Sequence, residues 1–174
     1  MSLTINKILF PTDLSIHSRY AFDYAAAIAV RYNASVVILH VLEELQTNIE
    51  AQLALFLGVT NWKTIRDLHL ADTKETLVGK MNDKAKIRLA LKSFWHDAKN
   101  NASGEKHVED KVVVMEGNLV ETIIEQAKTR QCDLIVMTYY ARNMIAEAMM
   151  SGVTRRVLRR SKKPVLLVPK KENG

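Results

Sequence analysis

The sequence predicts an α/β protein, a three-layer α/β/α sandwich in which helices cover both faces of a parallel five-stranded sheet. Two observations lead to this fold class. Short runs rich in valine, isoleucine and leucine lack polar alternation, which is typical of parallel strands buried on both faces. Segments with helical spacing of apolar residues separate most of these runs. The predicted strands are Lys7–Phe10, Ser35–Val41, Lys111–Met115, Asp133–Met137 and Pro164–Val168.

The first two strands and the helix between them form a crossover unit. Pro11 ends the first strand because proline has no backbone donor. Ser15 is placed to cap the helix, and Asn33 suits the left-handed residue that closes it. Such a unit is right-handed, so its two strands are parallel. The predicted buried face of the helix consists of Ala21, Tyr24, Ala25, Ile28 and Tyr32.

The segment after the second strand contains no convincing strand. Ile49–Leu57 and Trp62–Leu70 have the composition of short helices. A long amphipathic helix follows, with its start between Thr73 and Asn82 and an apolar face made of Ile87, Leu91, Phe94, Trp95 and Ala98. Because a crossover needs only about a dozen residues, residues 42–80 are predicted to form an enlarged helical segment. It is a lid, a partner surface or, as is most frequent, a passive elaboration.

The stretch Cys132–Val168 predicts a strand, a loop, a helix and a final strand. The loop Thr138–Asn143 follows the fourth strand directly. Open parallel sheets bind ligands at the carboxyl ends of their strands. The helical spacing after the loop is carried by Ile145, Met149, Val153 and Val157. This loop is therefore the first candidate for a ligand-binding site.

Length and composition limit the class of protein. At 174 residues the chain is predicted to be a single domain over residues 1–174. No apolar run has the length of a membrane span, and residues 1–6 lack a signal pattern. The single cysteine, Cys132, excludes an internal disulfide and suits a reducing compartment, so a cytoplasmic location is expected. Its place before a strand predicts a buried structural thiol.

The net charge of +6 is concentrated near the end of the sequence. Between Arg155 and Glu172 there are eight basic residues and one acidic residue. One interpretation is an anion-binding or nucleic-acid patch. The other is a helix whose last turns carry cations because the helix dipole favours them there. No interleaved aromatic residues support base stacking, so the second interpretation is favoured and a nucleic-acid partner is not expected.

Three segments together resemble the universal stress protein family. They are KILFPTDLS with the later VVILHV, then EGNLVETIIEQAKTRQCDLIVM, and finally SGVTRRVLRRSKKPVLLVP. The resemblance covers nearly all of the chain except Leu42–Lys80. It implies the strand order 3-2-1-4-5 of the Rossmann-like fold of this family. It also implies a cytoplasmic homodimer paired through the last strand, Pro164–Val168, which would otherwise be an exposed apolar edge.

ATP-binding members of the family carry the pattern G-x-x-G, nine residues, then G-[S/T], between the fourth strand and the closing helix. In this sequence the glycine positions hold Thr138, Ala141 and Ser151, and Gly152 stands at the Ser/Thr position. All three glycines are therefore replaced. Side chains now stand where a phosphate would need bare backbone. Arg142 remains beside the loop as a candidate phosphate partner.

Outside this loop, the sequence matches the family's pocket residues more closely. Asp13 resembles the residue that contacts the ribose, and Val41 resembles the adenine contact. Each also has a structural explanation, since a carboxylate favours a helix start and a valine favours a buried strand. The resemblance implies that the ligand-binding residues are Pro11, Thr12, Asp13, Val41, Met137, Thr138, Ala141, Arg142, Ser151, Gly152, Val153 and Thr154. The candidate ligands are ATP or a less charged adenine compound, unless nucleotide binding has been lost.

Catalysis has little support in the sequence. The five histidines show no metal-ligand spacing, and neither a G-x-S-x-G elbow nor a complete P-loop occurs. Stress-response regulation by a binding protein, with a protein partner of unknown identity, is the leading hypothesis. The alternative is an ATP-binding switch or an enzyme that slowly hydrolyses ATP or transfers its phosphate.

Overall fold

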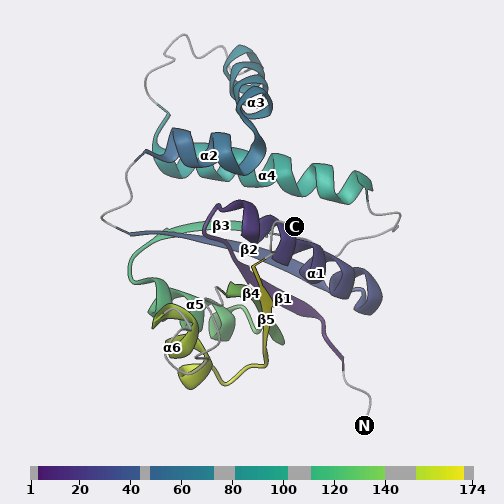
Figure 1. The fold of residues 1–174 in the computed structure, drawn as a ribbon. Coiled ribbons are helices and arrows are strands. Elements are labelled where there is room, and N and C mark those ends of the chain that lie inside the picture. Colours follow the sequence, from purple (N-terminus) through teal and green to yellow (C-terminus); the bar gives the residue numbers. More distant parts are fainter. Residues whose placement is uncertain (1–3, 44–47, 73–80, 102–110, 140–151, 171–174) are drawn as a thin grey trace.

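Five parallel strands form one sheet in the order β3-β2-β1-β4-β5, which is the order that the family resemblance implied (Figure 1). The structure is a computed structural model that describes residues 4–43, 48–72, 81–101, 111–139 and 152–170. The order reverses between β1 and β4, which creates the switch point where such sheets bind ligands. The strands are β1 (Lys7–Pro11), β2 (Ser35–Leu42), β3 (Lys111–Glu116), β4 (Leu134–Tyr139) and β5 (Val165–Pro169).

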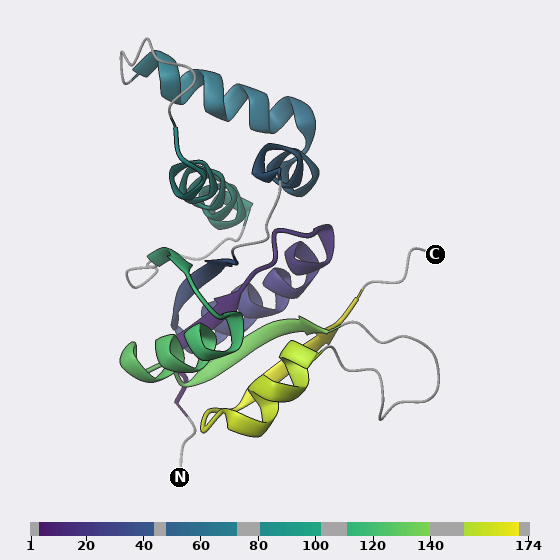
Figure 2. The ribbon, with the colours of Figure 1, turned by 90° about the vertical axis from the view of Figure 1, so that its left-hand side faces the viewer.

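Helices cover both faces of the sheet, which confirms the three-layer sandwich. Helices α1 and α4 pack on one face, and α5 and α6 pack on the other. Helices α2 and α3 add a further layer beside α4, with α3 farthest from the sheet (Figures 1 and 2). The helices are α1 (Ile16–Tyr32), α2 (Ile49–Leu57), α3 (Val59–Asp72), α4 (Asp83–Asn101), α5 (Leu119–Thr129) and α6 (Gly152–Arg160). Whether the whole chain is one domain stays a prediction.

An aromatic cluster joins the extra helices to the sheet. The ring of Phe22 on α1 lies 5.2 Å from that of Phe10, 4.9 Å from that of Phe94 and 5.3 Å from that of Trp95. Phe56 on α2 lies 4.9 Å from Phe94 on α4. Edge-to-face contacts of this kind add to the free energy of burying the rings. Helices α2 and α4 are therefore attached to the sheet through the core of the α1 face.

The predicted buried face of α1 is partly wrong. Tyr24 and Tyr32 are 43% and 44% exposed, whereas Phe22 and Ala29 are buried beside Ala21 and Ala25. An alanine-rich helix has a weak apolar moment, so its own sequence does not specify which side turns inward. The contact of Phe22 with the α4 aromatics selects the face.

Local signals for helix ends are confirmed. The Ser15 side chain accepts a hydrogen bond from the Ser18 amide, and Asn33 closes α1 in the left-handed conformation. Helix α4 begins at Asp83, with Asn82 Oδ1 accepting from the Ala85 amide at 2.9 Å.

Across the described segments, none of the helices combines the length and the apolar composition that a membrane span requires.

The single cysteine is a buried thiol, as predicted. Cys132 is fully buried two residues before β4, in the cluster beneath α5 and α6. Burial raises the pKa of the Cys132 thiol because the thiolate would lose its hydration. The residue therefore packs as a small apolar side chain.

Candidate ligand-binding site

A cavity of about 220 Å³ lies at the carboxyl ends of β1, β2 and β4, where α5 and α6 begin. This is the switch point of the sheet. Its described lining combines apolar side chains with hydroxyls, two carboxylates and an imidazole. The lining residues are Pro11, Thr12, Asp13, Ser18, His40, Val41, Glu43, Leu119, Ile123, Met137, Thr138, Val153 and Thr154.

The turn between β1 and α1 is held by short hydrogen bonds. The Thr12 amide donates to the Leu39 carbonyl at 2.8 Å, which joins the turn to β2. Thr12 Oγ1 accepts from the Leu14 amide at 3.1 Å and lies 2.9 Å from Ser18 Oγ. Leu14 has a φ of +58°, a conformation that costs a leucine about 1 kcal/mol or more. These bonds hold the turn despite that cost and orient Asp13 at the pocket.

Asp13 also supports the start of α1. Its Oδ1 accepts a hydrogen bond from the Ser15 amide at 3.0 Å. A carboxylate at this position satisfies a backbone donor near a helix start, where negative charge is favourable. Since the same side chain lines the cavity, the structural and the ligand-binding interpretations of Asp13 are compatible.

His40 is a lining residue that the sequence analysis did not select. Its side chain is 1% exposed, and its Nδ1 lies 2.8 Å from the Thr12 carbonyl oxygen. Because a carbonyl only accepts, Nδ1 carries the proton and donates. The histidine thus ties the end of β2 to the β1–α1 turn. A histidine inside the apolar run SVVILHV, one residue before the predicted adenine contact, was the signal available in the sequence.

The structure places eight of the twelve predicted site residues around this cavity, namely Pro11, Thr12, Asp13, Val41, Met137, Thr138, Val153 and Thr154. Gly152 is the first residue of α6 and is not among the lining residues. Ala141, Arg142 and Ser151 lie outside the described residues. Besides His40, the sequence analysis missed Ser18, Glu43, Leu119 and Ile123, which reach the pocket from α1, the end of β2 and the start of α5.

Thr138, which the family resemblance aligns with the first glycine of the ATP-binding pattern, lies in β4 at the wall of the cavity. Its Oγ1 is buried and has no hydrogen-bond partner among the described residues. An unpaired buried hydroxyl costs about 1–3 kcal/mol. The residue as a whole is partly buried, and it lines the cavity with a hydroxyl that carries this cost.

The basic residues of α6 lie mostly outside this cavity. Arg160 donates to both carboxylate oxygens of Glu121 on α5, with Nη2 2.7 Å from Oε2. This pair lowers the pKa of Glu121 below its usual value and links the two helices. Arg155 and Arg159 are exposed, and neither lines the cavity.

Within the described ranges, no group of three His, Cys, Asp or Glu residues is arranged to hold a metal ion.

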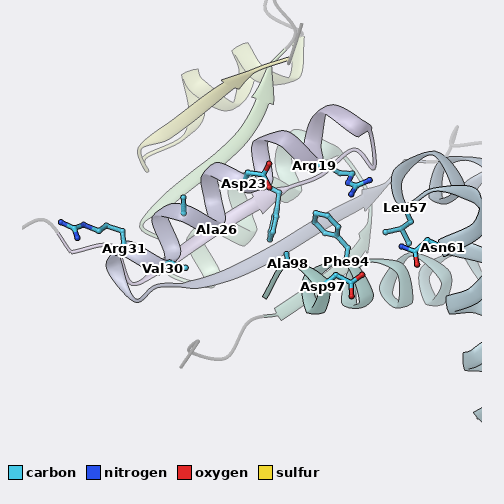
Figure 3. A pocket seen from close by; sticks show the side chains of 12 residues that line it. Arg19, Asp23, Ala26, Val30, Arg31, Leu57, Asn61, Phe94, Asp97 and Ala98 are labelled. Carbon is cyan, nitrogen blue, oxygen red and sulfur yellow. The ribbon is translucent and has the colours of Figure 1, made fainter. Parts of the chain in front are cut away.

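A second and larger cavity, of about 740 Å³, lies between α1 and α4 and is closed at one end by Leu57 and Asn61. Figure 3 shows Val30 and Arg31 of α1 at its other end, with Phe94, Asp97 and Ala98 of α4 along one side. None of the predicted ligand-binding residues lines it. This groove is larger than the pocket at the switch point, but the sheet topology and the predicted residues favour the smaller pocket.

The fold and this pocket define a Rossmann-like α/β protein with a cavity at the switch point of its sheet. The model of the universal stress protein family matches residues 4–169. The chain belongs to that family.

Relatives and solved structures agree with this family. The universal stress protein MJ0577 of Methanocaldococcus jannaschii is 29% identical over 99% of this chain and all of its own length. The structure of UspA from Lactobacillus plantarum has a TM-score of 0.61 at 20% identity, over 96% of this chain and 99% of its own. A universal stress protein in complex with cAMP has a TM-score of 0.60 at 24% identity, over 97% of this chain and all of its own.

Proposed function

We propose that this chain is a stress-response regulatory protein whose pocket binds an adenine-nucleotide-type ligand. The observation that carries the proposal is the convergence of eight predicted binding residues on one cavity at the switch point. The solved relative in complex with cAMP supports an adenine compound as the ligand class. Val41, Ile123 and Met137 supply apolar walls for a base, and Asp13 lines the same cavity and resembles the residue that contacts the ribose in the family.

A binding role is favoured over catalysis because polar groups of the pocket form hydrogen bonds that hold the protein's own turn in place. The hydroxyls of Thr12 and Ser18 bond to each other, and the Nδ1 proton of His40 is taken by a backbone carbonyl. None of these contacts pairs a nucleophile with a base in the manner of an activated hydroxyl. An ATP-dependent switch or a slow ATP-hydrolysing enzyme is the second candidate. The start of α6 at the pocket favours it, because a helix N-terminus attracts anions.

Calorimetric titration of nucleotide-stripped protein with adenosine, AMP, cAMP and ATP with Mg²⁺ tests the proposal. We expect saturable binding of at least one adenine compound, and loss of that binding in Asp13→Ala. Tight ATP binding with turnover that Asp13→Ala abolishes would instead establish the second candidate. If the protein binds none of the four compounds, the adenine pocket is disproved and the search moves to protein partners.

We also propose that the protein is a cytoplasmic homodimer paired through β5. This strand is at the edge of the sheet, and Val165, Leu166 and Leu167 are only partly buried. An apolar edge with unpaired backbone groups is stabilised when a second copy adds its own strand. The single buried thiol suits the reducing conditions of the cytoplasm.

Leu166→Arg tests the dimer. An arginine in the edge strand should lower the sedimentation coefficient from the value of a dimer to that of a monomer, because dimerisation would bury its charge in the interface between the two copies of β5. Leu55→Arg is the matched control, since Leu55 is 72% exposed on α2 and away from the sheet edge. A Leu166→Arg protein as dimeric as the control would disprove pairing through β5.

A further inference from the structure

Basic side chains gather at the end of the sheet where the strands begin. The register of β1, β4 and β5 brings Lys7, Asp133 and Lys163 to the same end of three neighbouring strands. Arg130 joins them from the end of α5, since Lys7 Nζ donates to its carbonyl at 3.1 Å. The positive charges of Lys7, Arg130 and Lys163 all reach the buried Cys132 thiol, where they oppose the rise in its pKa that burial causes. Three cations from separate elements therefore surround one point at this end of the sheet.

Three exposed cations extend this group. Lys128 lies in the last turn of α5, Arg159 lies in the last turn of α6, and Lys162 lies in the turn that leads to β5. Both helices end where the strands begin, so these turns lie at one end of the sheet (Figure 2). We call this group the basic end, and it consists of Lys7, Lys128, Arg130, Arg159, Lys162 and Lys163.

The described residues around the basic end do not balance its charge. The start of β1 and the turns before β4 and β5 contain one carboxylate, that of Asp133. Its Oδ2 accepts hydrogen bonds from the backbone amides of Asn6 and Lys7 at 2.8 and 3.0 Å. Among the described residues, none of the six cations forms an ion pair. Six cations thus face one carboxylate that already serves the backbone.

Helix dipoles account for only part of this group. The C-termini of α5 and α6 each act as about half a negative charge, so together they offset about one cation. Lys7 lies in a strand and has no helix end of its own to favour it. In the sequence, the cations after Arg155 form one basic stretch, for which the helix dipole is the favoured explanation. The fold adds Lys7, Lys128 and Arg130 to them, and the dipoles do not explain that convergence.

The basic end and the pocket occupy opposite ends of the sheet. The pocket lies at the carboxyl ends of β1, β2 and β4. Tyr139 and Gly152, which flank residues 140–151, end β4 and begin α6 on the side of the pocket. The turns before β4 and β5 are described over their full length. A ligand in the pocket therefore leaves the basic end accessible.

The chemistry of the basic end fits an acidic polypeptide. Lysine and arginine bind carboxylates through charge-assisted hydrogen bonds, and basic clusters recognise acidic motifs in this way. The start of β1 and the turns before β4 and β5 contain no aromatic side chain on which nucleic-acid bases would stack. They also expose no large apolar side chain of the kind that anchors a protein at a membrane surface. We propose that the basic end docks an acidic segment of a partner protein.

Fluorescence anisotropy with a labelled octaglutamate peptide tests the proposal. One triple variant removes three cations of the basic end and combines Arg159→Gln, Lys162→Gln and Lys163→Gln. The matched control removes the same charges from exposed positions on α3 and α4 and combines Arg88→Gln, Lys63→Gln and Lys92→Gln. The basic-end variant should weaken peptide binding about ten-fold, the combined effect of three ion pairs at a surface. The control should keep the affinity of the wild type.

Lys128→Glu is an independent variant, because Lys128 belongs to α5 and not to the turn that leads to β5. It tests the proposal even if the triple variant disturbs β5. Reversing this charge should weaken peptide binding about three-fold or more. Added salt should weaken the binding of the wild type as well, because exposed charges are screened.

Several results would overturn the proposal. The octaglutamate peptide could fail to bind the wild type, or both triple variants could weaken it equally, which would assign the binding to net charge alone. A short DNA duplex or phosphatidylserine vesicles could bind the basic end more tightly than the peptide at the same ionic strength, which would replace the acidic polypeptide by another partner. The inference does not rest on the adenine pocket. Adenosine calorimetry should give the same result for the basic-end variant and the wild type, so the two proposals can fail separately.

Discussion

The pocket at the switch point and the groove between α1 and α4 differ in how they are built. The small pocket is formed where strands end and helices begin, and backbone hydrogen bonds such as Thr12 to Leu39 hold its walls. The groove between α1 and α4 is formed by side chains packed around the ring of Phe22. The described lining of the pocket has two carboxylates and no basic residue, whereas that of the groove has two arginines and two aspartates.

The difference favours the pocket at the switch point as the candidate site, although the groove is larger. Side chains between two packed helices leave gaps wherever their shapes do not match. A groove at such a place can therefore result from imperfect packing and does not by itself indicate a binding site. A cavity at the switch point arises from the chain topology itself, and it gathers residues from several elements. Substitutions should therefore affect stability through the groove and ligand affinity through the pocket.

Phe22→Ala should have the largest effect on stability. Phe22 is 1% exposed and touches the rings of Phe10, Phe94 and Trp95. Removing it should lower the free energy of unfolding by about 3–5 kcal/mol in a urea titration. The control Tyr24→Ala, at an exposed position on the same helix, should cost less than about 1 kcal/mol. A large loss of adenosine affinity in folded Phe22→Ala would show that the two cavities are coupled.

His40→Leu should have an intermediate effect, and it should act on the pocket. The substitution leaves the buried Thr12 carbonyl without its donor, which costs about 1–3 kcal/mol of stability. Loosening of the turn should also weaken adenosine binding in calorimetry. His40→Asn keeps an N–H donor near the position of Nδ1, so it should recover part of both losses. Equal affinities in His40→Leu and the wild type would show that the histidine does not position the turn for the ligand.

Glu50→Gln should have the smallest effect on stability, and it should act through the contacts among α2, α3 and α4. Its Oε2 accepts from Trp62 Nε1 at 2.7 Å, and its Oε1 lies 3.1 Å from Lys86 Nζ. Burial alone would raise the pKa of Glu50, but the hydrogen bonds from Trp62 and Lys86 outweigh it and lower the pKa. A lowered pKa stabilises the fold above the unfolded value of about 4.3, and this stabilisation is lost as the pH falls through the folded value.

The measurement is the urea midpoint between about pH 7 and about pH 3. Because the Glu50 side chain is 39% exposed, the contribution is expected to stay below about 1 kcal/mol. Glu50→Gln should flatten the acid side of the profile, whereas Glu125→Gln on the exposed face of α5 should not. An unchanged profile in Glu50→Gln would show that the contacts of this carboxylate contribute nothing to stability.

The lining residues that the sequence predicted lie mostly at or just after the ends of strands, where the strand pattern and the parallel topology together fix their position. Pro11, Thr12 and Asp13 follow a strand directly, and Val41 and Met137 end two others, so parallel pairing alone brings them to one edge of the sheet. Ser18 and Leu119 belong to helices, and they reach the pocket only because each helix start packs beside it. His40 is hidden in sequence because its role depends on a carbonyl 28 residues away.

The sequence by itself determined the elements, their parallel arrangement and the family, because periodicity, caps and crossover handedness act over short stretches of chain. Through the family resemblance it also predicted that Thr138, Ala141 and Ser151 replace the three glycines of the ATP-binding pattern. Only the tertiary structure decided which face of α1 is buried, that Asp13 and Glu43 share one pocket, and that a larger groove competes with it. These properties depend on packing between residues distant in sequence, which local propensities do not encode.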